Sequence, residues 1–176
     1  MTPLLRTRRT AAAALALTAA LMLTACNSTD NSAPPAPGAP TGTSAPAQFT
    51  TVSGSTVSVP GEKPTAVFFF SVGCGACVGG AKALAGAAEK LGSAASFVLV
   101  DMNPGESAQT VTGFQSDTGT QAIPAVIDTG ATLTTRYSVA ALSTLLVIDP
   151  SGKVSYRATD PSTDQITDAL RKAGAA

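Results

Sequence analysis

Residues 66–77 read AVFFFSVGCGAC, and an Ala- and Leu-rich segment follows them up to residue 91. An apolar run that is rich in aromatic residues and ends at glycine predicts a buried central strand. The two cysteines, Cys74 and Cys77, come directly after this run. In the following segment the apolar side chains recur at helical spacing, which predicts an amphipathic helix. The cysteines therefore lie where a strand turns into a helix.

This position favours redox chemistry. Residues three apart in a first helical turn share a face, and Cα atoms about 5–6 Å apart suit a disulfide. The free N–H groups and the positive end of the helix stabilise a thiolate on Cys74, so we expect Cys74 to attack and Cys77 to resolve. Gly73 and Gly75 let the backbone bend and leave the Cys74 sulfur uncovered. A structural disulfide and a soft-metal site remain as alternatives.

Composition limits the chemistry further. The chain has 176 residues, 44% of them hydrophobic and 12% charged, which allows one ordinary domain with a core plus additional segments. The formal net charge of +0 gives no indication of nucleic acid binding. The chain contains no His. Its absence excludes Ser-His-Asp and Cys-His catalysis and His-ligated metal sites, and we expect no cofactor.

The N-terminus reads as an export signal. Arg6, Arg8 and Arg9 precede an apolar segment, residues 11–23, that is too short for a comfortable membrane span. The sequence LTAC at residues 23–26 then resembles the lipobox of bacterial lipoproteins, in which the cysteine is lipidated and becomes the mature N-terminus. We therefore expect residues 1–25 to be a signal peptide and Cys26 to anchor the chain to the outer side of the bacterial cell membrane. The pair Arg8-Arg9 keeps twin-arginine export open as an alternative route.

Residues 26–47 begin with Cys26 and continue with Pro, Ala, Ser, Thr and Gly, with almost no large apolar side chain. Such a segment cannot build a core, so we expect a disordered tether. The folded domain is expected at residues 48–176.

Further elements are expected along this domain. Asp101, Asp128 and Asp149 each follow or end a predicted strand, where turn or cap roles are expected. A strand, a helix and a second strand at residues 66–101 indicate a right-handed parallel βαβ unit. Other strands are predicted at residues 49–52, 56–59, 123–127, 145–148 and 153–157, and helices at residues 106–117, at residues 133–137 and after a capping box at residues 162–165.

This order, with CGAC after an apolar strand, resembles the thioredoxin fold, and more closely the extracytoplasmic, membrane-anchored TlpA-like thiol–disulfide proteins. The likeness covers about residues 49–173 and is carried by residues 68–77, by residues 137–139 leading into 145–148, and by IDPSGKV at residues 148–154. It implies an α/β fold in which helices flank both faces of a central mixed β-sheet.

The resemblance also implies a function. Cys74 and Cys77 would exchange disulfides with exported proteins that carry thiols or disulfides, and a membrane redox partner would recycle the pair. The groove that receives these substrates would comprise Gly73, Gly75, Ala76, Leu142, Ser143 and Thr144. The sequence sets neither the redox potential nor the direction of electron flow.

Four positions depart from the family pattern. Gly73 replaces the usual aromatic residue, Phe68 stands where many members have a buried acid, and Gly80 stands near a frequent Glu. Ser143 occupies the position of the cis-proline that faces the cysteines, and Pro124 is a rival for that role. Because a non-proline cis bond costs about 2.5–4 kcal/mol, we expect Leu142–Ser143 to be trans.

Because of these departures, two other functions stay open. Two thiolates suit a soft ion such as Cu(I) or Hg(II), although the absence of His disfavours a dedicated copper carrier. A non-catalytic interaction domain with a structural disulfide is the other. Peroxide reduction is a weaker fourth function, because the Cys-x-x-Cys spacing does not suit it.

Overall fold

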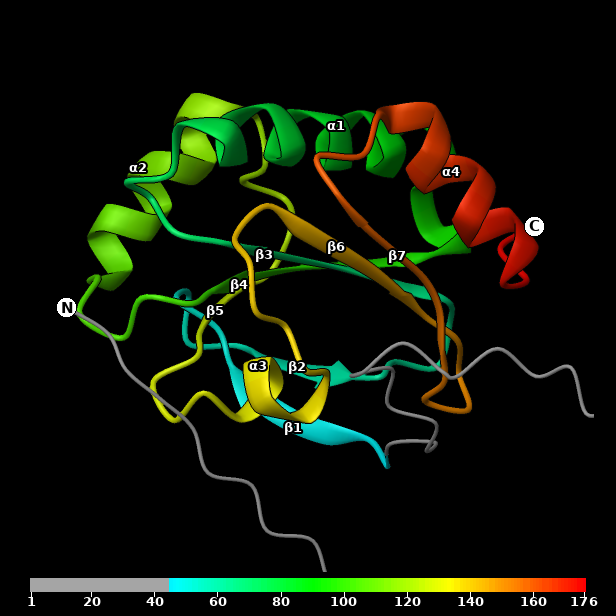
Figure 1. Cartoon of the computed structure of the whole chain (residues 1–176), viewed down its shortest axis with the longest axis horizontal. Helices are drawn as coiled ribbons and strands as arrows, with labels where there is room; N and C mark the ends of the chain where they lie inside the picture. Colours follow the sequence, from blue (N-terminus) through cyan, green and yellow to red (C-terminus); the bar gives the residue numbers. More distant parts are fainter. Residues whose placement is uncertain (1–44) are drawn as a thin grey trace, which may run out of the picture. The chain divides into compact units, whose positions relative to one another are not determined.

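The computed structural model describes residues 45–176, and their central feature is a five-stranded mixed sheet with strand order β5-β4-β3-β6-β7 (Figure 1). The central strand β3 (Thr65–Phe70) pairs in parallel with β4 (Ser96–Asp101) and antiparallel with β6 (Thr144–Ile148). On the outside, β5 (Ala125–Ile127) runs parallel to β4, and β7 (Val154–Thr159) runs antiparallel to β6. Every residue of β3 is buried, which agrees with the continuous apolar run at residues 66–70.

Different elements cover the two faces of the sheet. One face packs against α1 (Gly75–Leu91), α2 (Ala108–Thr118) and α4 (Thr163–Lys172) (Figure 1). The other packs against α3 (Thr132–Arg136) and a hairpin of β1 (Ala47–Thr50) and β2 (Thr56–Val59). The short 3-10 helix η1 (Gly92–Ala94) connects α1 to β4. The expected thioredoxin-like architecture, a mixed sheet with helices on both faces, is confirmed.

Alternate side chains of β3 divide the core in two. Phe68 and Phe70 point toward α1, α2 and α4, whereas Val67 and Phe69 point toward α3 and the hairpin. The ring of Phe70 stacks on that of Phe114 in α2, with 4.5 Å between the ring centroids. The period of two along a strand is the reason that a single apolar run serves both cores.

The hairpin corrects one predicted strand. β1 spans Ala47–Thr50 rather than residues 49–52, and β2 spans Thr56–Val59 as expected. Thr51 and Val52 leave the ladder because the Thr51 N–H donates to Ser55 O and the Val52 N–H donates to Ala125 O, each at 2.8 Å. Ala47 is thus part of a strand and not of the tether.

Two further boundaries differ for local reasons. Helix α2 begins after Ser107, whose side chain caps it by accepting the Thr110 N–H, so Glu106 lies outside the helix. Strand β5 begins at Ala125 because Ile123 is still in a turn and donates its N–H to Thr120 O at 2.9 Å. The other predicted helices and strands agree with the structure within two residues, except that α1 reaches back to Gly75 and begins directly after Cys74.

Caps and turns agree with the sequence pattern better than the ends of the strands and helices do. The capping box of Ser162 and Gln165 is present at the start of α4, and Gly92 caps the end of α1. Asp149 holds the β6–β7 turn by accepting the N–H groups of Ser151 and Lys153. The buried side of α1 consists of Cys77, Gly80, Ala81, Leu84 and Ala87.

The predicted signal peptide and Cys26 lie outside the described residues, as does the tether up to residue 44. In the described part of the chain, no helix has the length and apolar character needed to cross a membrane.

The peptide bond Leu142–Ser143 is trans as expected, and so is Ile123–Pro124. Over residues 45–176, Val59–Pro60 is the one cis bond.

Candidate active site at the start of helix α1

Cys74 and Cys77 form a disulfide at the first turn of α1, with their Cα atoms 5.3 Å apart. Cys74 is the N-cap residue, and its Sγ accepts the Cys77 N–H at 3.2 Å. Cys77 is completely buried, whereas Cys74 is partly exposed. The accessible sulfur is therefore the one that the helix N-terminus stabilises as a thiolate, which suits the roles predicted for the two residues.

A carboxylate from another loop holds the turn in front of Cys74. Glu106 accepts the Ser71 hydroxyl at 2.7 Å and the Val72 N–H at 3.1 Å from each of its oxygens. The Ser71 carbonyl in turn accepts the Cys74 N–H at 3.0 Å. Glu106 thus fixes the segment from which Cys74 is presented, a role that the sequence gave no local signal for.

A second acid lies beside Glu106. Asp101, the last residue of β4, is fully buried, and its Oδ1 accepts the Asn103 N–H at 2.9 Å, which confirms the turn role expected for it. Its Oδ2 is buried with no hydrogen-bond donor in the described part of the chain. Burial above all, and then the neighbouring charge of Glu106, raises the pKa of Asp101 to about 6. The site therefore contains a buried acid, although not at the position of Phe68.

Ser143 lies just before β6, at the edge of the sheet where β3 ends. It is buried and has a positive φ of 59°, and its Oγ lacks a partner among the described residues. In this disulfide form the Ser143 hydroxyl donates to neither cysteine. Opposite it, a Cβ added to Gly80 would lie 3.1 Å from Ser143 Oγ and 2.4 Å from Cζ of Phe68. The Phe68 ring therefore fills the space beneath Gly80.

A hollow of about 550 Å³ lies beside the cysteine pair. One wall is the start of α1, and the other is the loop between β7 and α4. Among the residues of these two walls, Ala76 was predicted from the sequence as part of the groove, whereas the loop at Asp160 and Pro161 was not. The lining residues are Ala76, Gly79, Gly80, Lys82, Ala83, Asp160, Pro161, Ser162 and Thr163.

The other predicted groove residues surround this region without lining the hollow. Gly73 and Gly75 are exposed on either side of Cys74. Leu142 is exposed, Ser143 is buried against α1, and the Thr144 hydroxyl donates to Ala141 O at 2.7 Å. Their part in substrate binding remains a prediction.

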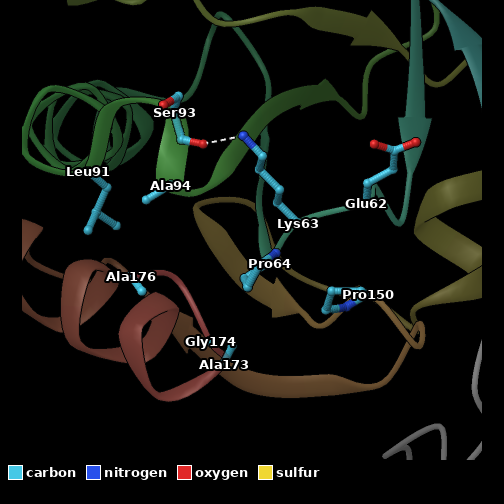
Figure 2. Close-up of a pocket in the computed structure, with 10 residues that line it drawn as sticks. All are labelled: Glu62, Lys63, Pro64, Leu91, Ser93, Ala94, Pro150, Ala173, Gly174 and Ala176. Carbon is cyan, nitrogen blue, oxygen red and sulfur yellow. Dashed lines mark hydrogen bonds between the residues drawn. The ribbon is translucent and has the colours of Figure 1, made fainter.

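A larger hollow, of about 730 Å³, lies at the opposite end of β3 from the cysteines (Figure 2). Pro64 and Pro150 line it, and Lys63 donates to the carbonyl of Ser93. Its lining includes no residue of the first turn of α1, whereas the smaller hollow includes Ala76, which lies between the two cysteines in the sequence. The cysteine pair therefore defines the candidate site, in spite of the smaller hollow beside it.

The described residues contain no group of three or more His, Cys, Asp or Glu side chains arranged to hold a metal ion. Any ion held by this part of the chain at the cysteines would have to accept the two thiolates alone, which limits it to soft ions of low coordination number.

The fold and the cysteine pair together define a thioredoxin-like thiol–disulfide oxidoreductase. Residues 34–173 match the Redoxin family, and the chain belongs to that family. A protein of Streptomyces lividans described as "Mercury resistance operon ORF3" is 56% identical over 147 residues, which is 80% of this chain and 78% of that protein.

Solved structures agree on the fold. The exposed lipoprotein thioredoxin Etrx1 of Streptococcus pneumoniae has a TM-score of 0.63 and 19% identity, over 73% of this chain and 99% of that one. A secreted Mycobacterium tuberculosis disulfide oxidoreductase has a TM-score of 0.60 and 18% identity, over 71% and 94% of the two chains. At these identities the comparison supports the shared fold alone.

Proposed function

We propose that this chain is a lipid-anchored, extracytoplasmic oxidoreductase that exchanges disulfides with exported proteins. The observation that carries the proposal is the asymmetry of the cysteine pair. Cys74 is partly exposed and receives an N–H from the first turn of α1, while Cys77 is buried behind it. A structural disulfide needs no such difference between its two sulfurs.

The exchange conserves atoms and electrons. In the reduced chain, the Cys74 thiolate attacks a substrate disulfide and forms a mixed disulfide, and the released substrate sulfur takes up a proton. Cys77 then loses its proton and attacks the Cys74 sulfur, which releases the second substrate sulfur and leaves the Cys74–Cys77 disulfide seen here. Two electrons pass from the cysteine pair to the substrate. The same steps in reverse oxidise a substrate dithiol.

The proposed location rests on sequence and on likeness. The basic and apolar residues 1–25 and the LTAC sequence ending at Cys26 have the pattern of a lipoprotein signal. Two proteins with the same fold are described as an exposed lipoprotein and as secreted. Labelling cells with a palmitate analogue tests the anchor: a lipidated product that disappears in Cys26→Ser supports it, and an unlabelled wild-type chain rejects it.

The redox potential of the cysteine pair tests the activity. The full chain carrying Cys26→Ser, so that one cysteine pair remains, is equilibrated with glutathione buffers and trapped with an alkylating agent. A potential between roughly −270 and −120 mV, the range of known exchange proteins, supports the proposal. A disulfide that stays oxidised below about −300 mV indicates a structural bond and rejects it.

A second candidate function is binding of Hg(II). It is favoured by the 56% identity to a protein described as encoded in a mercury resistance operon. The reduced pair provides two thiolates and no third ligand in the described residues, which suits the linear coordination of soft ions. In this function the reduced pair binds one ion and transfers no electrons.

Titration distinguishes the two candidates. The reduced Cys26→Ser chain is titrated with Hg(II) in the presence of glutathione as a competitor, and Cys74→Ser/Cys77→Ser is the matched control. Stoichiometric retention of one ion together with no turnover of a protein disulfide favours metal binding. Turnover of the protein disulfide without retained metal favours the oxidoreductase.

A further inference from the structure

We infer that Asp101 and Glu106 form a carboxyl pair that positions the loop before Cys74 and makes reduction of the disulfide depend more steeply on pH than two thiols alone would. The inference deepens the proposed function and rests on it, since it concerns regulation of the same cysteine pair.

A continuous set of contacts connects the two acids to the cysteine. Asn103 connects the two acids, because its N–H donates to Asp101 Oδ1 at 2.9 Å and its side-chain amide donates to Glu106 Oε1 at 3.0 Å. Glu106 also accepts the Ser71 hydroxyl and the Val72 N–H. Ser71 then accepts the Cys74 N–H through its carbonyl. Asp101 itself is held in place by β-pairing with Phe70, the last residue of β3. The pair is therefore attached to the strand end and to the loop from which Cys74 projects.

The pair has a natural place for one shared proton. Asp101 Oδ2 is buried and receives no hydrogen bond in the described part of the chain, and the neighbouring acid that acts on it is Glu106. A proton on Oδ2 would be donated to Glu106, which would leave one negative charge instead of two. The raised pKa of Asp101, about 6, means that this proton is held close to neutral pH.

Neighbouring elements bring little other charge to Asp101. The loop from Ser71 to Gly73 has no ionisable side chain, α1 carries its first charge at Lys82, and α2 carries its own at Asp117. Asp128, after β5, is occupied by the N–H groups of Leu133 and Thr134 and the Thr134 hydroxyl. Glu106 is thus the charged group that acts on Asp101.

Reduction couples the pair to the sulfurs. A substrate dithiol supplies two electrons and is itself oxidised to a disulfide, the Cys74–Cys77 bond breaks, and Cys77 keeps a proton while Cys74 becomes a thiolate. The new negative charge on Cys74 adds to that on Glu106, so Asp101 binds its proton more tightly in the reduced form. Reduction then takes up as much as one additional proton from solvent at pH values above about 6.

The test measures the glutathione equilibrium of the full Cys26→Ser chain at several pH values from about 5 to 9. One extra proton adds up to about tenfold per pH unit to the pH dependence of the equilibrium constant. We expect this additional slope in the wild-type background and its loss in Asp101→Asn, whose amide donates to Glu106 at every pH. Glu106→Gln, which keeps an acceptor for the Val72 N–H, is expected to reduce it, because burial still raises the pKa of Asp101 when the charge of Glu106 is removed. Asp117→Asn removes an exposed charge from α2 and is the control that keeps the additional slope.

Equal pH profiles for the parent chain and both variants would overturn the inference while leaving the proposed function intact. If Asp101→Asn does not fold, Glu106→Gln decides alone. A disulfide that fails to equilibrate with glutathione in every variant would reject the proposed function, and this inference with it.

Discussion

Gly80 on α1 lies directly over the ring of Phe68 on β3. A Cβ at position 80 would come within 2.4 Å of Phe68 Cζ and 2.6 Å of Cε2. The two residues are the places where similar proteins often carry acids, and here a bulky ring and a missing side chain fit one another. Phe68 and Gly80 are therefore packed against one another as a single unit.

Gly80→Ala should accordingly destabilise the domain by about 1–3 kcal/mol, because the ring has no space to withdraw in a packed core. Gly79→Ala is the matched control, since a Cβ there meets no atom within 4 Å. That control should stabilise α1 by about 0.5–1 kcal/mol through the higher helix propensity of Ala. Urea unfolding of both variants measures the difference, and equal effects of the two substitutions would show that Phe68 moves freely.

Asp101 makes stability depend on pH. Its pKa is raised from the ordinary 3.8 to about 6, so the folded chain binds the proton more tightly than the unfolded chain does. This contribution to stability is complete below about pH 4 and is lost as the pH rises through about 6. Asp101→Asn should not lose stability as the pH rises, and it should be more stable than the wild type at pH 8 by about 1–2 kcal/mol. The full conversion of the pKa shift, at about 1.4 kcal/mol for each pKa unit, would give a larger gain in stability. We expect the smaller gain because solvent screens the partly exposed Glu106.

Thermal unfolding of the oxidised chain at pH 4 and pH 8 provides the measurement. The advantage of Asp101→Asn should be present at pH 8 and absent at pH 4. An advantage of the same size at both values would assign the effect to packing and not to the proton.

The two cysteines should differ when each is replaced. Cys77→Ser leaves the accessible Cys74 free to attack and removes the thiol that resolves, so it should accumulate mixed disulfides with exported proteins. Cys74→Ser leaves only a buried thiol and should trap at least tenfold less. Non-reducing gels of both variants in the Cys26→Ser background give the comparison. Similar trapping by both would contradict the assigned order of attack.

Ser143 has a strained backbone, and its buried hydroxyl has no hydrogen-bond partner within residues 45–176. Ser143→Gly should stabilise the chain by about 1–3 kcal/mol, because glycine accepts a positive φ and the hydroxyl is removed. Ser143→Ala removes the hydroxyl but keeps a Cβ at a positive φ, so it should stabilise the chain by only about 1 kcal/mol. Ser143→Pro should be destabilising, since proline requires a φ near −65° and the structure has 59° here.

Urea unfolding ranks these three variants. A stable Ser143→Pro chain would mean that the segment before β6 adopts a second conformation. If Ser143→Gly loses stability, the hydroxyl has a partner in solution, and its role at the site would need a different account.

Features that depend on neighbours in the chain were predictable from the sequence alone. The strand that ends at Phe70, the helix that ends at Leu91 and the capping box of Ser162 and Gln165 depend on periodicity and on hydrogen bonds a few residues long. The cysteine pair belongs to this group, because its chemistry follows from the first turn of a helix. The same local logic predicted the trans bond before Ser143.

Only the tertiary structure decided which distant residues complete the site. Glu106 reaches back 35 residues to Ser71, and Asp101 becomes an unusual acid because burial at the end of β4 removes it from water. The β7–α4 loop forms a wall of the hollow for the same reason, since α4 packs against α1. The burial of a single acid and a long-range hydrogen bond have no signature in a single sequence, because both depend on which elements become neighbours after the chain has folded.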